Sequence, residues 1–185
     1  MRKLLKIGIV VLVFIVLLVV SVLSAFLFDL SSYGATGSET LNPNGPSVGR
    51  ALVVYAPGFS GAAKQDATKI ANDLRANGYI VVLAGVRSGT ASNRSNYDII
   101  IAGGPIYWGQ VSSSIDGYLK TLPNKAKLGV FGSTGSGTFS KSDFTSFQTQ
   151  VTSYTHNEKV VEKLILNGNE TNDCADLVSK LMHYG

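Results

Sequence analysis

The chain has 185 residues, a formal net charge of +4 and one cysteine. Three of its 16 lysines and arginines precede residue 7, so the 13 that follow residue 28 exceed the 12 acids by only one. The remaining basic residues form no cluster, which argues against nucleic acid as a partner. Because Cys174 is alone, an intrachain disulfide is excluded, and two distant histidines provide no set of metal ligands.

The first element in chain order is an apolar run from Ile7 to Phe28. A run of ~20 apolar residues suffices to cross a bilayer. A cleaved signal peptide has a shorter apolar core of roughly 7 to 15 residues, so residues 1–28 are predicted to be an uncleaved transmembrane anchor. Arg2, Lys3 and Lys6 precede the run, which by the positive-inside tendency places the amino terminus in the cytoplasm and the rest of the chain outside.

The next segment, residues 29–50, is predicted to be a flexible tether. From Ser31 to Arg50 it is rich in Ser, Gly, Asn, Pro and Thr and has no apolar period. A single domain is then expected over residues 51–185, a length that suits one hydrophobic core.

Apolar runs and helical stripes alternate along this domain. Short apolar runs predict strands at 51–56, 79–83, 97–102, 127–131 and 160–166. Apolar residues at helical spacing predict helices at 63–74, 111–122, 144–154 and 174–182, with Ser60 capping the first and Gly78 ending it. Residues 85–96 are polar and have no apolar face, so a short helix or none is expected there. The alternation predicts an α/β fold, a doubly wound open parallel sheet with helices on both faces.

Three loops follow strands of this sheet and are expected at its carboxyl edge, where open α/β sheets bind ligands: 57–63, 103–110 and 132–140. The first leads into a helix amino terminus, which attracts phosphate, and Gly58 and Gly61 permit close approach of the backbone. The second carries Tyr107 and Trp108, either of which can stack on a flat apolar ligand. The alternative is that both rings fold back on the core.

The order of these parts resembles the flavodoxin family, over about residues 50 to 183. The resemblance rests on the segments Tyr55–Lys64, Gly104–Gly109 and Phe131–Phe139, which are similar to the family's phosphate loop and its two flavin loops. It implies five parallel strands in spatial order 2-1-3-4-5 and noncovalently bound FMN. The residues implied to bind FMN are Gly58, Phe59, Ser60, Gly61, Ala62, Ala63, Gly104, Pro105, Ile106, Tyr107, Trp108, Gly109, Gly132, Ser133, Thr134, Gly135 and Phe139.

The phosphate loop departs from the family's pattern, because flavodoxins carry several hydroxyls there and this chain keeps only Ser60. Two lost hydrogen bonds to a charged group weaken binding by about two to four orders of magnitude. Two functions therefore stay open. The first is an FMN-binding electron-transfer domain tethered to the membrane, with an unidentified redox partner protein. The second is a flavodoxin-like fold that has lost FMN and acts as a membrane-tethered binding module.

Enzyme activity is also left open. A flavin-dependent reductase cannot be separated from a simple electron carrier, and neither needs a catalytic acid, base or nucleophile of the protein. The segment Gly58–Ala62 comes within one residue of the hydrolase pattern Gly-x-Ser-x-Gly, with His156 and His183 as candidate bases. Both histidines lie in unsuitable places along the predicted elements, which disfavours a serine hydrolase.

Overall fold

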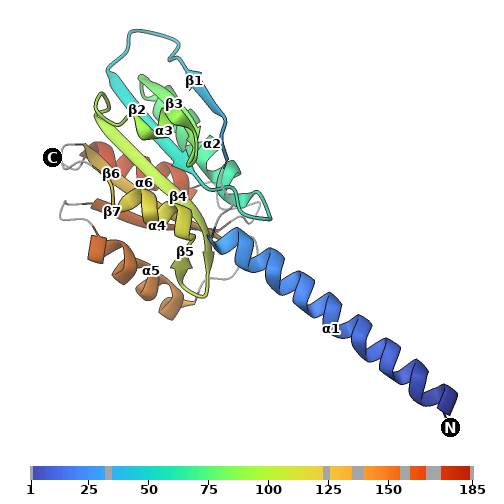
Figure 1. The fold of residues 1–185 in the computed structure, drawn as a ribbon. Coiled ribbons are helices and arrows are strands. Elements are labelled where there is room, and N and C mark those ends of the chain that lie inside the picture. Colours follow the sequence, from blue (N-terminus) through green and yellow to red (C-terminus); the bar gives the residue numbers. More distant parts are fainter. Residues whose placement is uncertain are drawn as a thin grey trace.

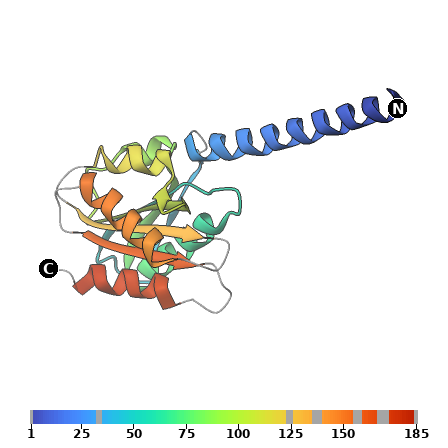
Figure 2. The ribbon, with the colours of Figure 1, turned by 90° about the horizontal axis from the view of Figure 1, so that it is seen from below.

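The computed structural model describes residues 2–31, 35–122, 126–134, 140–154, 159–165 and 172–183. A twisted sheet carries helices on both faces, and a long helix projects from one edge of this domain (Figures 1 and 2). The helices are α1 (Arg2–Ser31), α2 (Ala62–Ala76), α3 (Gly89–Ser92), α4 (Ser113–Leu119), α5 (Lys141–Tyr154) and α6 (Asn172–His183). The strands are β1 (Ser38–Leu41), β2 (Gly49–Tyr55), β3 (Tyr79–Gly85), β4 (Ile99–Tyr107), β5 (Gln110–Val111), β6 (Lys127–Thr134) and β7 (Lys159–Ile165).

The five predicted strands form one parallel sheet in the order β3-β2-β4-β6-β7. In chain order of the predicted strands this is 2-1-3-4-5, so the expected topology is confirmed. The described residues contain two further strands, which the sequence prediction missed. β1 pairs antiparallel with β3 at the sheet edge, and β5 pairs antiparallel with the end of β4.

Strand β1 lies inside residues 29–50, where only a flexible tether was expected. It pairs along Ser38 to Leu41, and Gly85 N–H and Arg87 N–H continue the pairing to the carbonyls of Gly37 and Ala35. Its side chains are exposed apart from that of Leu41, which is half-buried. Backbone hydrogen bonds hold this edge strand in the sheet. Such pairing does not require apolar side chains, which explains why the sequence of β1 has no apolar alternation.

Both faces of the sheet are buried, which explains the continuous apolar runs. In β2, Ala51 and Val53 pack on the face covered by α2 and α6, while Leu52 and Val54 pack on the face covered by α4 and α5. Cys174 is buried in the first of these two layers. Successive strand residues point to opposite faces, so a strand between two helical layers needs apolar side chains at every position.

Helix α1 contains a 22-residue segment, Lys6–Leu27, that is long and apolar enough to cross a membrane. At a rise of about 1.5 Å per residue this segment spans about 33 Å, close to the thickness of a bilayer core. Its side chains are exposed except that of Phe26, which is half-buried. A signal sequence can have the same length and composition.

Two local expectations differ from the structure. The helix predicted from Val111 begins at Ser113, because Val111 pairs with Ile106 as part of β5. The amino cap of α2 is Gly61 rather than Ser60, although the Ser60 hydroxyl oxygen accepts a hydrogen bond from the Ala62 N–H at 3.3 Å. The segment after β3 agrees with its expectation, because it forms only the short helix α3.

The Tyr118 hydroxyl, on α4, is buried and has no hydrogen-bond partner in the described structure. Burial raises the pKa of Tyr118 to about 12, although the Arg94 guanidinium, 4.6 Å from the ring centroid, opposes the shift. We expect Tyr118→Phe to raise the free energy of unfolding by about 1 kcal/mol, since an unpaired buried hydroxyl is removed.

Urea unfolding at several pH values measures this effect. The folded state disfavours ionised Tyr118, whereas the unfolded chain ionises it at the usual tyrosine pKa of 10.0, so the wild-type chain loses stability as the pH rises from there to about 12. The Tyr118→Phe variant lacks this component of the loss. If the free energy of unfolding falls equally in the two proteins above pH 10, the raised pKa of Tyr118 is contradicted.

Candidate functional site

The candidate site lies at the carboxyl edge of the sheet, where β2, β4 and β6 end. The sequence prediction placed residues 103–110 in a loop, but β4 continues through Tyr107 and β6 through Thr134, with Gly104 opposite Gly132. A side chain at Gly132 would collide with Ile106, and one at Gly103 would collide with Phe131. Glycine at these positions lets two strands with bulky neighbours stay paired, which extends the sheet toward the site.

The loop after β2 forms a turn and then the amino terminus of α2. Gly58 and Gly61 have φ angles of 64° and 69°, a backbone conformation that favours glycine. The first helical hydrogen bond runs from Gln65 N–H to the Gly61 carbonyl. The N–H groups at the start of a helix have no acceptors within the helix, so this turn presents donors suited to an anion. Phe59 and Ser60 are exposed beside it.

Gly58 also brings this loop against β4. A Cβ atom at Gly58 would lie 2.9 Å from Pro105 Cγ and 3.4 Å from the Tyr107 hydroxyl oxygen. The predicted phosphate loop and the predicted aromatic loop are therefore in contact. Because Gly58 is buried between them, their separation is set by packing.

The aromatic segment is a two-residue hairpin turn between β4 and β5. Tyr107 pairs with Gln110, which leaves Trp108 and Gly109 as the central residues, with φ angles of 50° and 73°. Such turns favour Asn-Gly, because both central residues need positive φ. Trp108 is the only non-glycine residue with positive φ in the described structure. A conformation that costs about 1–2 kcal/mol here holds an indole ring that is 77% exposed.

Neither ring folds back on the core, which was the alternative interpretation of this segment. Tyr107 is half-buried, and its ring centroid lies 4.8 Å from that of Phe26 on α1. The Trp108 centroid lies 5.0 Å from Phe26, again in an edge-on arrangement. No pattern in the sequence connects Phe26 with this site, because Phe26 lies within the apolar run predicted to be the membrane anchor.

A buried carboxylate beneath the edge was also missed. Asp66 of α2 is 2% exposed and accepts a hydrogen bond of 2.5 Å from the hydroxyl of Ser133, itself 1% exposed. Asp66 lies three residues after Ala63 and four before Ile70, on the apolar stripe of the helix. An acidic residue on such a stripe is the sequence signal for a buried polar contact. The bond ties α2 to the end of β6.

The third predicted loop is described only in part. Gly132, Ser133 and Thr134 belong to β6, next to the end of β4. Gly135 and Phe139 lie outside the described residues. Ala62 and Ala63 begin α2 and are buried, and Gly109 is buried in the hairpin turn. The described members of the three predicted segments thus come together at one edge.

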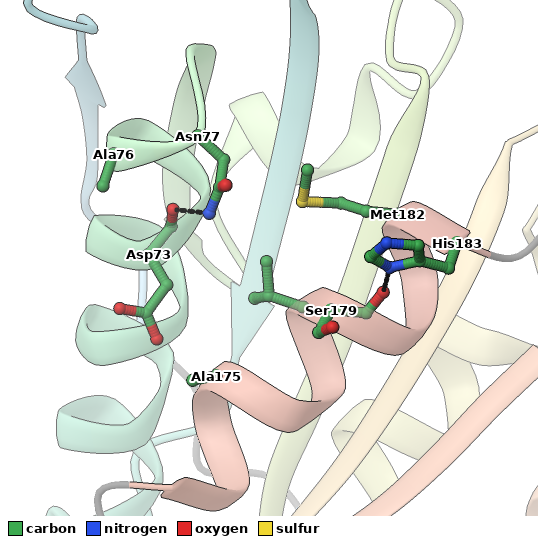
Figure 3. Close-up of a pocket in the computed structure, with 8 residues that line it drawn as sticks. Asp73, Ala76, Asn77, Ala175, Ser179, Met182 and His183 are labelled. Atoms are coloured by element: carbon green, nitrogen blue, oxygen red, sulfur yellow. Dashed lines mark hydrogen bonds between the residues drawn. The ribbon is translucent and has the colours of Figure 1, made fainter.

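A pocket of about 210 Å³ lies elsewhere, between the carboxyl ends of α2 and α6 (Figure 3). Asp73 and His183 line it, and burial raises the pKa of the Asp73 carboxyl while Lys69 opposes the rise. Both helices run back from the carboxyl edge, so this pocket is at the opposite end of the sheet from Ser60. His183, whose Nδ1 lies 2.7 Å from the Ser179 carbonyl oxygen, is therefore not a base for Ser60. His156 lies outside the described residues.

Comparison with known proteins gave no match to a family model and none to a curated protein. Among solved structures, a flavodoxin of Streptococcus pneumoniae TIGR4 is similar, with 21% identity, a TM-score of 0.55, and coverage of 72% of this chain and 97% of that one. Flavodoxin 2 from Bacillus cereus has 20% identity, a TM-score of 0.52 and coverage of 72% and 97%. An apo NADH:FMN oxidoreductase has 11% identity, a TM-score of 0.57 and coverage of 72% and 88%. The chain therefore carries a flavodoxin-like domain.

Proposed function

We propose that this chain is a membrane-anchored electron carrier that binds FMN at the carboxyl edge of its sheet. The observation that carries the proposal is the turn at Trp108 and Gly109. It holds an exposed indole in a costly conformation, next to a loop whose backbone donors suit a phosphate. Strain of this kind persists where the surrounding structure imposes it, and it is concentrated at ligand sites.

The residues at this edge fit FMN. The start of α2, with Gly61, Ala62 and Ala63, would hold the phosphate through backbone N–H groups, and Ser60 would add a hydroxyl. A Cβ atom at Gly61 would meet nothing within 4 Å, so the space in front of this turn is open. Trp108 would stack on the isoalloxazine ring. Bound FMN supplies the redox chemistry by taking up and releasing electrons.

The residues of the chain would bind and orient FMN without acting as an acid or a base. Tyr107 and Pro105, packed against Gly58, fix the distance between the phosphate end and the aromatic end of the site. The Asp66 to Ser133 hydrogen bond holds α2 against β6 below it. This rigid support keeps the ordering cost of binding low, which offsets part of the loss from the missing loop hydroxyls.

The membrane anchor is α1, and the redox partner is an unidentified protein. The cations Arg2, Lys3 and Lys6 at its start favour, by the positive-inside tendency, an orientation in which the domain would lie outside the cytoplasm. Access of added protease to the domain in intact cells tests this orientation.

Titration of the purified full chain in detergent with FMN tests the proposed cofactor. We expect saturable quenching of flavin fluorescence and a shifted flavin absorption band, because the isoalloxazine ring leaves water and contacts an indole. Riboflavin, which lacks the phosphate, serves as the control ligand and is expected to bind more weakly. A chain that leaves both ligands unchanged contradicts the proposal.

That contradictory result would support a second candidate function, a membrane-tethered binding module without FMN. The observation that favours it is the loop between Gly58 and Ala63, where Ser60 is the sole side-chain hydroxyl. A flavin phosphate there would depend almost entirely on backbone donors.

A further inference from the structure

The carboxyl edge of the sheet is the edge from which α1 departs. In both ribbon views α1 leaves the domain beside the ends of β4 and β5 and points away from it (Figures 1 and 2). Among side chains 6–27 of α1, only that of Phe26 is half-buried, and the others are exposed. Phe26 contacts Tyr107 and Trp108, with ring centroids 4.8 and 5.0 Å apart.

This contact determines which part of α1 lies beside the carboxyl edge of the sheet. The segment ends at Leu27, one residue after Phe26. Side chains in contact with Phe26 are therefore level with the end of the membrane-spanning part of α1. When α1 crosses a bilayer, this level is the boundary between the acyl chains and the headgroups.

The side chains exposed at this edge suit that boundary. Outside α1, four large apolar side chains are exposed in the described structure, and two of them, Phe59 (60%) and Trp108 (77%), belong to this edge. Tryptophan is enriched at membrane interfaces because its ring is apolar and its N–H is polar.

Three exposed cations belong to segments that begin or end at this edge, and the exposed Glu39 of β1 pairs with Leu83 near the end of β3. Lys64 at the start of α2, Arg87 after β3 and Lys141 at the start of α5 are exposed. Asp143, in the first turn of α5, is half-buried and accepts a hydrogen bond from the Ser140 hydroxyl. Each cation near an anionic surface adds to its attraction for the protein.

We propose that the carboxyl edge of the domain is a membrane-facing surface, with Trp108 and Phe59 inserted among the headgroups of the bilayer that α1 crosses. This inference rests on the proposed anchoring by α1 and concerns the chain without FMN, because Trp108 is also the ring proposed to stack on the flavin. A flavin held at this edge would exchange electrons at the bilayer surface, so its redox partner protein would be embedded in the membrane.

The test uses tryptophan fluorescence, because Trp108 is the only tryptophan of the chain. The full chain is reconstituted without FMN into phosphatidylcholine vesicles containing phosphatidylglycerol, and vesicle flotation first verifies anchoring. Lipids with a nitroxide on the headgroup are expected to quench Trp108 more strongly than lipids with a nitroxide at the end of the acyl chain. The control carries Trp108→Phe and Tyr97→Trp, which moves the indole to the opposite edge of the sheet.

The proposal predicts at least a twofold stronger quenching of Trp108 than of the control tryptophan by headgroup nitroxide. Equal quenching of the two, in chains that float with vesicles, overturns the membrane-facing surface while leaving anchoring and FMN binding untouched. A chain that does not float overturns the anchor and this inference together. FMN titration in detergent reports on the cofactor separately.

A second pair of variants tests the contact that orients the domain. Phe26→Ala removes the ring that touches Trp108, and Phe14→Ala is the matched control, because it removes the same kind of side chain at a position of α1 where that side chain is 66% exposed. Loss of an aromatic contact reduces the population of the oriented state by about twofold to tenfold. Phe26→Ala is expected to reduce quenching of Trp108 by headgroup nitroxide, and Phe14→Ala to leave it unchanged. Equal quenching in both variants contradicts the orienting role of Phe26.

Discussion

Replacing Trp108 with glycine is expected to weaken FMN binding by about 10- to 100-fold, while the domain keeps its stability within about 1 kcal/mol. Stacking removes a large apolar surface from water, an effect of about 1.5–3 kcal/mol, which corresponds to this change in affinity. Stability is preserved because the exposed indole contributes little packing, and because glycine relieves a positive φ of 50°. FMN titration and urea unfolding of the full chain in detergent measure the two effects.

The Trp108→Phe variant is the matched control. It keeps an aromatic ring and the same backbone strain, so FMN affinity is expected to stay within about tenfold of the wild type. If the Trp108→Gly variant binds FMN as tightly as the wild type, the flavin does not stack on this ring. A loss of stability of about 3–5 kcal/mol, as for a buried aromatic residue, contradicts the exposed position of the indole.

Replacing Gly58 with alanine is expected to destabilise the domain by about 2–5 kcal/mol. An L residue at a φ of 64° costs about 1–2 kcal/mol, and the new methyl group would lie 2.9 Å from Pro105 Cγ, an overlap worth about 1–3 kcal/mol. The variant separates the phosphate loop from β4, so weaker FMN binding is expected as well. Urea unfolding measures the free energy change.

Gly61→Ala separates backbone strain from crowding. Its φ of 69° is similar, but a Cβ atom there would meet nothing within 4 Å. The free energy of unfolding of this variant is expected to fall by only about 1–2 kcal/mol, the cost of an L residue at positive φ. Equal destabilisation by the two substitutions would mean that the loop is not packed against Pro105.

The parallel sheet could be predicted from the sequence because burial on both faces marks each strand. Runs such as Ala51–Ala56 are apolar at every position, and helical stripes lie between them. The order 2-1-3-4-5 came from the resemblance of the loops to one family, and the structure has it. Strand β1 could not be predicted this way, since edge pairing by backbone hydrogen bonds makes no demand on side chains.

The candidate site was predictable only as a set of segments. Glycine and proline at 103–105 indicated a loop, yet these residues continue β4 because Gly103 and Gly132 allow close packing beside Phe131 and Ile106. Local composition favours a turn there, and tertiary pairing overrides it. The hydrogen bond between Asp66 and Ser133, 67 positions apart, had only a weak signal in the sequence.

Local patterns of burial were enough to predict the α/β class, the apolar helix of residues 7–28 and the three segments whose described members lie at one edge. The outward position of Trp108 in a strained turn, the contact of Gly58 with Pro105 and Tyr107, and the contact of Phe26 with the aromatic pair became known only from the folded structure. These contacts join residues far apart in the chain. Their geometry depends on how strands and helices pack, which no short stretch of sequence encodes.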